Sequence, residues 1–121
     1  MIPAFAKTLT AHKINLKRLP LTTLQINVGK LCNQTCRHCH VDAGPTKKRE
    51  NMSRETAERI MQLIRATPSI KTVDITGGAP ELNPNFRWLI EQCTAQKIEV
   101  IDRCNLTVLL LEDQHDTAAF L

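Results

Sequence analysis

Three segments with strand patterns, separated by segments with helical spacing, constrain the fold of this chain more than any other feature. Apolar and polar residues alternate strictly over 24–28 and 71–76, which is the period of a strand with two different faces. Residues 98–103 form the third strand-like segment. Strands that alternate with helices in this way pair in parallel through right-handed crossovers. The sequence therefore predicts an α/β fold of about three βα units.

The first predicted helix follows Ser53, a residue type that accepts backbone hydrogen bonds at helix N-termini. It should end at Thr67, because Pro68 cannot continue a helix. The residues that share its apolar face are Ala57, Ile60, Met61 and Ile64. We expect this face to pack against the sheet.

The second predicted helix has Asn83 as its N-cap and Pro84 at its first position, where a missing N–H does no harm. Its apolar face would consist of Phe86, Leu89, Ile90 and Cys93. Cys93 is accordingly interpreted as a small buried hydrophobic residue. After the third strand, residues 106–111 lead to a helical segment over 113–121 that has barely begun.

One face of the predicted sheet is polar, which indicates a curved sheet around a site rather than a filled core. The residues with this parity are Gln25, Asn27, Thr72, Asp74, Thr76, Glu99, Arg103 and Asn105. Asp74 and Glu99 could be site groups or merely polar residues at a wet barrel mouth. Cys104 has the opposite parity, which favours packing and leaves a reactive thiol as the alternative.

A complete eight-unit barrel takes about 250 residues, and this chain has 121. We therefore interpret it as the N-terminal part of a partial, TIM-like (β/α) barrel, apparently truncated. Residues 1–20 would be an N-terminal arm and residues 21–121 the core, with the site at the C-terminal ends of the strands.

Composition excludes several classes of partner and location. The net charge is +4, but aromatic residues make up only 3%, so the stacking platforms of single-strand nucleic-acid binders are missing. No apolar run approaches the roughly 20 residues that cross a bilayer. Residues 1–20 lack the features of an export signal. We expect a cytoplasmic protein, with no nucleic-acid or membrane partner, whose five cysteines are reduced thiols.

Cys32, Cys36 and Cys39 follow the first strand with the spacing C-x3-C-x2-C, in a segment over 30–45 that we call the cysteine loop. Three thiolates can bind three irons of a [4Fe-4S] cubane and leave the fourth iron open. The amine and carboxylate of a methionine could chelate that iron, which would place its sulfonium beside a one-electron reductant. Residues 77–80, Gly-Gly-Ala-Pro, end the second strand nearby and form a turn that we call the glycine turn.

A structural zinc site is the rival interpretation of these cysteines, with His38 or His40 as the fourth ligand. Structural zinc is usually bound by two ligand pairs that are well separated in sequence, and no second cysteine pair occurs here. A third possibility is an inactive, truncated remnant. The spacing favours the cluster.

The motifs C-x3-C-x-x-C and Gly-Gly-Ala-Pro resemble those of the radical S-adenosylmethionine (SAM) superfamily, C-x3-C-x-aromatic-C and Gly-Gly-Glu-Pro. The segments 24–45, 72–84 and 101–107 further resemble the arsenosugar-biosynthesis radical SAM proteins, also called the radical SAM/Cys-rich domain family. The likeness covers about residues 20–110. It implies a transferase that moves the 5′-deoxyadenosyl group of SAM to a dimethylated trivalent arsenic compound. It also implies an electron donor such as flavodoxin or ferredoxin.

The resemblance assigns roles to particular residues. It implies that the three cysteines of the loop bind the cluster and that His38 lies beside the adenine. Arg103 and Asn105 would be further contacts to cofactor or substrate. The backbone contacts to the methionine amine would come from Gly77, Gly78 and Ala79. The chain departs from the superfamily pattern at Ala79, where glutamate is usual, although Glu81 is close in sequence.

Overall fold

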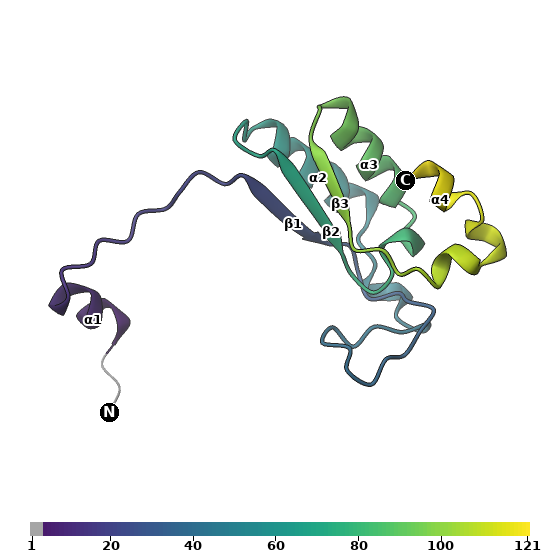
Figure 1. The fold of residues 1–121 in the computed structure, drawn as a ribbon, viewed down its shortest axis with the longest axis horizontal. Helices are drawn as coiled ribbons and strands as arrows, with labels where there is room; N and C mark the ends of the chain where they lie inside the picture. The colour runs from purple at the N-terminus through teal and green to yellow at the C-terminus, as the bar shows by residue number, and fades with distance from the viewer. Residues whose placement is uncertain (1–3) are drawn as a thin grey trace.

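The computed structural model describes residues 4–121, and these form a three-stranded parallel sheet covered on one face by helices (Figure 1). The strands lie in the order β1-β2-β3, with Ile26 of β1 beside Ile75 of β2 and Val73 of β2 beside Val100 of β3. The elements are α1 (Phe5–Ala11), β1 (Thr23–Asn27), η1 (Lys48–Glu50), α2 (Arg54–Arg65), β2 (Thr72–Thr76), η2 (Pro80–Leu82), α3 (Phe86–Ala95), β3 (Glu99–Asp102), η3 (Val108–Leu110), η4 (Glu112–Gln114) and α4 (Thr117–Phe120). The predicted α/β class is confirmed.

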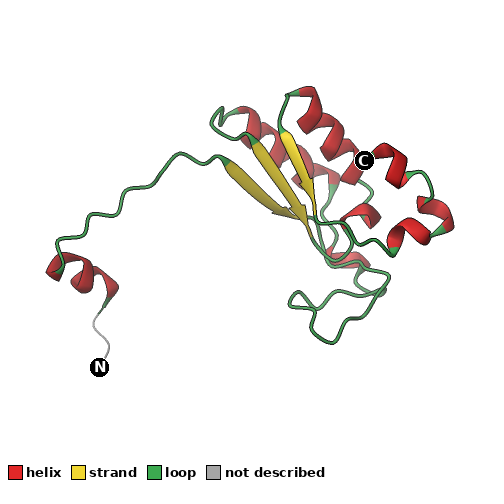
Figure 2. Ribbon diagram, in the orientation of Figure 1, coloured by secondary structure: helices red, strands yellow, loops and turns green. Residues whose placement is uncertain are grey.

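The hydrophobic core lies between the sheet and helices α2 and α3. Its strand residues include Ile26, Val73 and Ile75, all less than 5% exposed. The helices contribute Ala57, Met61, Ile64, Phe86, Leu89 and Cys93. Both predicted apolar faces therefore pack as expected, and burial raises the pKa of the Cys93 thiol to about 11. The opposite face of the sheet carries polar side chains, among them Gln25, Asp74 and Arg103. Helices α2 and α3 do not cover this face (Figure 2).

Helix α2 begins as the sequence predicts. The side chain of Ser53 accepts a hydrogen bond from the backbone N–H of Thr56 at 3.2 Å, which satisfies one of the free N–H groups of the first turn. The helix ends at Arg65, slightly before the predicted Thr67. Thr67 instead donates its N–H to Ile64 in the closing turn, immediately before Pro68.

The predicted role of Asn83 as a helix N-cap is wrong, because α3 begins only at Phe86. The amide nitrogen of Asn83 donates to the carbonyls of Val28, at 2.8 Å, and Met52, at 3.3 Å. Its oxygen accepts the N–H of Asn85 at 2.8 Å. The side chain thus ties the turn after β2 to the end of β1, and these distant partners are the reason that a local pattern misjudged it.

The segment after β3 is mostly tight turns, η3 and η4, and only α4 is helical in the region predicted over 113–121. Arg87 of α3 donates both terminal nitrogens to the carboxylate of Asp116, one of them at 2.7 Å, and its guanidinium lies over the ring of Phe120. These contacts hold α4 beside α3. Among the residues described, no helix combines the length and apolar character needed to span a bilayer.

Helix α1 contributes no buried residue and is joined to β1 by an extended segment (Figure 1). The division into an arm over 1–20 and a core over 21–121 stays a prediction.

Candidate functional site

The cysteine loop projects from the C-terminal ends of the strands (Figure 1). Its base is closed by a bridge in which Cys32 donates its N–H to Gly44 at 3.3 Å and Gly44 donates to Lys30 at 3.0 Å. Cys32 lies in this base and is buried, whereas Cys36 is exposed and Cys39 is partly exposed. Cys39 packs against a small apolar cluster that includes Cys32 and Ala43, so of the three cysteines only Cys36 lies on the exposed part of the loop.

The glycine turn is hydrogen-bonded directly to the start of the cysteine loop. The N–H of Gly78 donates to the carbonyl of Gly29 at 2.9 Å, and the N–H of Ala79 donates to that of Leu31 at 2.8 Å. A Cβ on Gly78 would collide with the carbonyl oxygen of Leu31 and would lie 2.8 Å from that of Lys30. Glycine is required at this position because two backbone segments touch there.

Two of the three sulfurs accept hydrogen bonds. The side-chain amide of Asn105 donates to the Sγ atom of Cys32 at 3.3 Å. The N–H of Ala43 donates to the Sγ atom of Cys39 at 3.3 Å, and backbone N–H groups, first that of Ala43, lower the pKa of the Cys39 thiol. The N–H donors at Cys39 favour its thiolate, which is the form that binds metal, and hydrogen bonds to ligand sulfurs adjust the potential of a bound cluster. The donor set thus fits an iron–sulfur cluster.

Asn105 joins the end of β3 to the loop by further contacts. Its amide donates to Asn33 at 2.9 Å, and its backbone N–H donates to a carboxylate oxygen of Glu81 at 2.8 Å. Asn105 therefore lies beside Cys32, and its predicted contact with cofactor or substrate stays a prediction. One carboxylate oxygen of Glu81 is therefore engaged with the backbone of Asn105.

The polar face of the sheet is organised by one ion pair. Arg103 donates to both oxygens of Asp74 at 2.8 Å, and Gln25 donates to the same carboxylate at 3.1 Å. The hydrogen bond from Arg103 is the main cause that holds the pKa of Asp74 below its usual value. Beside this pair, a polar depression is lined by Gln25, Asn27, His40, Thr76 and Arg103. His40, which the rival zinc interpretation offers as a fourth ligand, thus lines the depression on the polar side of the sheet.

Two predicted residues lie apart from this constellation. Glu99 is exposed at the N-terminal end of β3, where it accepts a hydrogen bond from Thr72, so of its two interpretations the structure favours a polar surface residue. His38 is exposed in the cysteine loop, and its predicted place beside an adenine stays a prediction.

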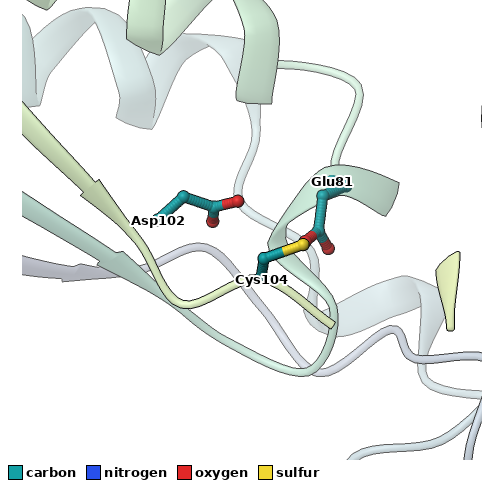
Figure 3. A group of neighbouring side chains, drawn as sticks. All are labelled: Glu81, Asp102 and Cys104. Carbon is teal, nitrogen blue, oxygen red and sulfur yellow. The ribbon is translucent and has the colours of Figure 1, made fainter. Parts of the chain in front are cut away.

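Asp102 and Glu81 are the residues that sequence reasoning missed. They lie with Cys104 near the end of β3, where Glu81 approaches from η2 (Figure 3). Burial, and then the charge of Glu81, raises the pKa of Asp102 to about 7. Burial and the neighbouring Glu81 raise the pKa of Cys104 to about 12. The sequence signal that could have revealed Asp102 is a carboxylate at a strand position whose neighbours on the same face are apolar.

Comparison with known proteins identifies the family. The sequence model of the radical SAM superfamily matches residues 26–117, which are most of the chain. The chain belongs to the radical SAM superfamily. Members of this superfamily use a [4Fe-4S] cluster and SAM, so the predicted cofactors are those of the family.

Individual relatives are probable GTP 3′,8-cyclases of archaea. The chain is 31% identical to that of Pyrococcus abyssi over 90 residues, which are 74% of this chain and 29% of the relative. It is 32% identical to that of Methanothermobacter marburgensis over 75 residues, which are 62% of this chain and 24% of the relative. The chain thus spans less than a third of the curated relatives that it matches.

The first prediction concerns the junction of glycine turn and cysteine loop. Gly78→Ala should lower the free energy of unfolding by about 1–3 kcal/mol, because the added methyl group has no room between two backbone segments. Gly44→Ala is the control, since a Cβ there meets nothing closer than 3.6 Å. Urea unfolding of both variants measures the difference. Equal stability of the two variants would contradict the close approach.

A second prediction concerns the pH dependence of folding stability. The pKa of Asp74 is lower in the folded state than its unfolded value near 3.8. The pairing of Asp74 with Arg103 therefore stabilises the protein fully at pH values above 3.8. This stabilisation is lost as the pH falls through the folded-state pKa. Arg103→Gln should therefore destabilise the protein at pH 7 and have progressively less effect below about pH 4. Thermal unfolding across this range measures it. In an Asp74→Asn background, the effect of Arg103→Gln on stability should be independent of pH. If the pH dependence persists there, a group other than Asp74 causes it.

Proposed function

We propose that this chain is the cofactor-binding part of a radical SAM enzyme, with Cys32, Cys36 and Cys39 as cluster ligands. The observation that supports this most is the direct hydrogen bonding of the glycine turn to the base of the cysteine loop. The two motifs that the resemblance connects with cluster and SAM thus lie together. When bound, the cluster supplies one electron that breaks a carbon–sulfur bond of SAM and releases a 5′-deoxyadenosyl radical.

The glycine turn would bind the methionyl end of SAM through its carbonyls. The N–H groups of Gly78 and Ala79 are used by the loop, whereas in the described chain the carbonyls of Gly77 and Gly78 receive no hydrogen bond from protein. Two unused acceptors beside the cysteines suit an ammonium group, which has three donors. They would perform the contact without a glutamate at position 79.

Arg103 and Asn105 would then have different tasks. The side chain of Arg103 is 57% exposed although it is paired with Asp74, and its remaining donor N–H groups could orient a carboxylate or hydroxyl on the polar face. Asn105 is occupied by Cys32 and Asn33, so it would orient the cluster ligand rather than touch SAM. His38 would cover the adenine from the loop.

The polar face itself supports a barrel interior. We infer that the three βα units are part of a partial (β/α) barrel whose inner surface carries the ion pair and the polar depression. Ligands of parallel sheets bind at the C-terminal ends of the strands, which is where the cysteine loop begins.

For the reaction, we favour transfer of the deoxyadenosyl group to a dimethylated trivalent arsenic compound. The support is the resemblance over 24–45, 72–84 and 101–107. A GTP cyclase is the second candidate, supported by the names of the archaeal relatives. Either reaction needs an electron donor such as a flavodoxin or ferredoxin. The exposed basic residues Lys48 and Arg49 near the loop would attract an acidic protein of that kind.

Anaerobic reconstitution with iron and sulfide tests the cofactor assignment. The chain should bind about four irons and four sulfides, and dithionite with SAM should yield 5′-deoxyadenosine. Cys36→Ala should lower iron content and SAM cleavage by at least tenfold, whereas Cys93→Ala, which changes a core cysteine, should retain both. A colourless protein that binds one zinc and no sulfide would favour the structural zinc module instead.

The same reconstituted protein separates the two substrates. With a dimethylated trivalent arsenic compound, the first candidate predicts a product that contains the deoxyadenosyl group bonded to arsenic. With GTP, the second candidate predicts free 5′-deoxyadenosine together with a cyclised nucleotide. Mass spectrometry of both incubations shows which product forms, and free 5′-deoxyadenosine alone in both would contradict each assignment while leaving the cofactor assignment intact.

A further inference from the structure

A second cluster of ligand-type side chains lies outside the cysteine loop. It consists of Glu81 from η2, Asp102 at the end of β3 and Cys104 just after it, and we call it the carboxylate–thiol group (Figure 3). One ligand atom from each residue lies within 4.8 Å of the other two. Figure 3 shows the three side chains directed toward a common space between the strand and the turn.

The oxygens of this group are buried without partners. Glu81 is only 5% exposed, and its Oε2 atom is closed to solvent and makes no hydrogen bond within the described chain. The same is true of both carboxylate oxygens of Asp102. A buried carboxylate oxygen without a donor is unfavourable by several kcal/mol, because it has lost its water and gained nothing. Stabilising all three of these oxygens as carboxylate oxygens would require a cation or several donors in the space between them.

A shared proton does not meet this requirement. It would join Glu81 to Asp102 by a short hydrogen bond, and no hydrogen bond joins their side chains. It would also leave one oxygen of Asp102 without a partner. By contrast, ligands around one tetrahedral ion, with bonds of about 2.0–2.3 Å, lie roughly 3.3–3.8 Å apart. The ligand atoms of this group lie within 4.8 Å of one another, so side-chain movements of about 1 Å would bring them to tetrahedral spacing.

We propose that Glu81, Asp102 and Cys104 bind one divalent transition-metal ion of the zinc class. The sulfur of Cys104 selects against magnesium and calcium, which prefer oxygen ligands alone. Three protein ligands leave one tetrahedral position for water. The proposal does not depend on the cluster, because none of the three residues belongs to the cysteine loop.

A metal ion at this position would be connected to the proposed cofactor site by the hydrogen bonds of Asn105. The second oxygen of Glu81 accepts the N–H of Asn105, and the side chain of Asn105 donates to Cys32. An ion that holds Glu81 would therefore fix the end of β3 against the base of the loop. The ion would in this way support the base of the cysteine loop.

Cobalt(II) titration tests the proposal in the full chain carrying Cys32→Ala, Cys36→Ala and Cys39→Ala, so that the loop thiols do not bind metal. One equivalent of cobalt should produce a thiolate-to-cobalt charge-transfer band and the visible bands of tetrahedral cobalt. Adding Cys104→Ser should abolish the charge-transfer band, and adding Asp102→Asn should weaken binding by at least about tenfold. Adding Cys93→Ala, the matched control at a buried cysteine, should leave both band and affinity unchanged. No charge-transfer band, or a band that survives Cys104→Ser, overturns the proposal.

A second measurement keeps the test decisive if the triple variant does not fold. The otherwise unmodified chain with its cluster reconstituted should retain one zinc per chain after desalting, in addition to its iron. Cys104→Ser should lose this zinc while keeping the iron. Zinc content that is zero in the parent, or equal in parent and variant, overturns the proposal, and neither result depends on SAM cleavage.

Discussion

The arrangement of this chain depends on the contact between two backbone segments, the end of β2 and the start of the cysteine loop. The N–H groups of Gly78 and Ala79 donate to carbonyls on either side of Lys30, and the absence of a side chain at Gly78 permits the approach. This contact connects the two motifs to which the proposed function assigns the cluster and SAM. Backbone N–H groups then lower the pKa of the Cys39 thiol, and Asn105 donates to the sulfur of Cys32, in a loop whose base is closed by a bridge.

The two faces of the sheet differ in character, one apolar and one polar. The face under α2 and α3 is filled with apolar side chains and provides stability, since each is removed from water. The other face carries the pair of Arg103 and Asp74 and the polar depression near His40. A charged pair on an open strand face contributes little to stability, because the Arg103 side chain is largely solvated.

The sequence predicted those features that depend on local spacing. The three strands, the apolar faces of α2 and α3, the Ser53 cap and the inward parity of Arg103 all follow from periods of two or 3.6 residues and from local caps. Asn83 was misjudged because its amide binds Val28 and Met52, which are distant in the chain. The carboxylate–thiol group was missed because Glu81 and Asp102 meet only after β3 has paired with β2. Tertiary partners of this kind leave no local pattern.

Electron paramagnetic resonance of the reduced, reconstituted chain tests the central claim, that glycine turn and cysteine loop together bind SAM at an open iron. The account predicts a [4Fe-4S]⁺ signal whose g values change when SAM is added, because the amine and carboxylate of SAM then bind the iron that lacks a cysteine. A signal that is identical with and without saturating SAM, or no iron–sulfur signal at all, would contradict it.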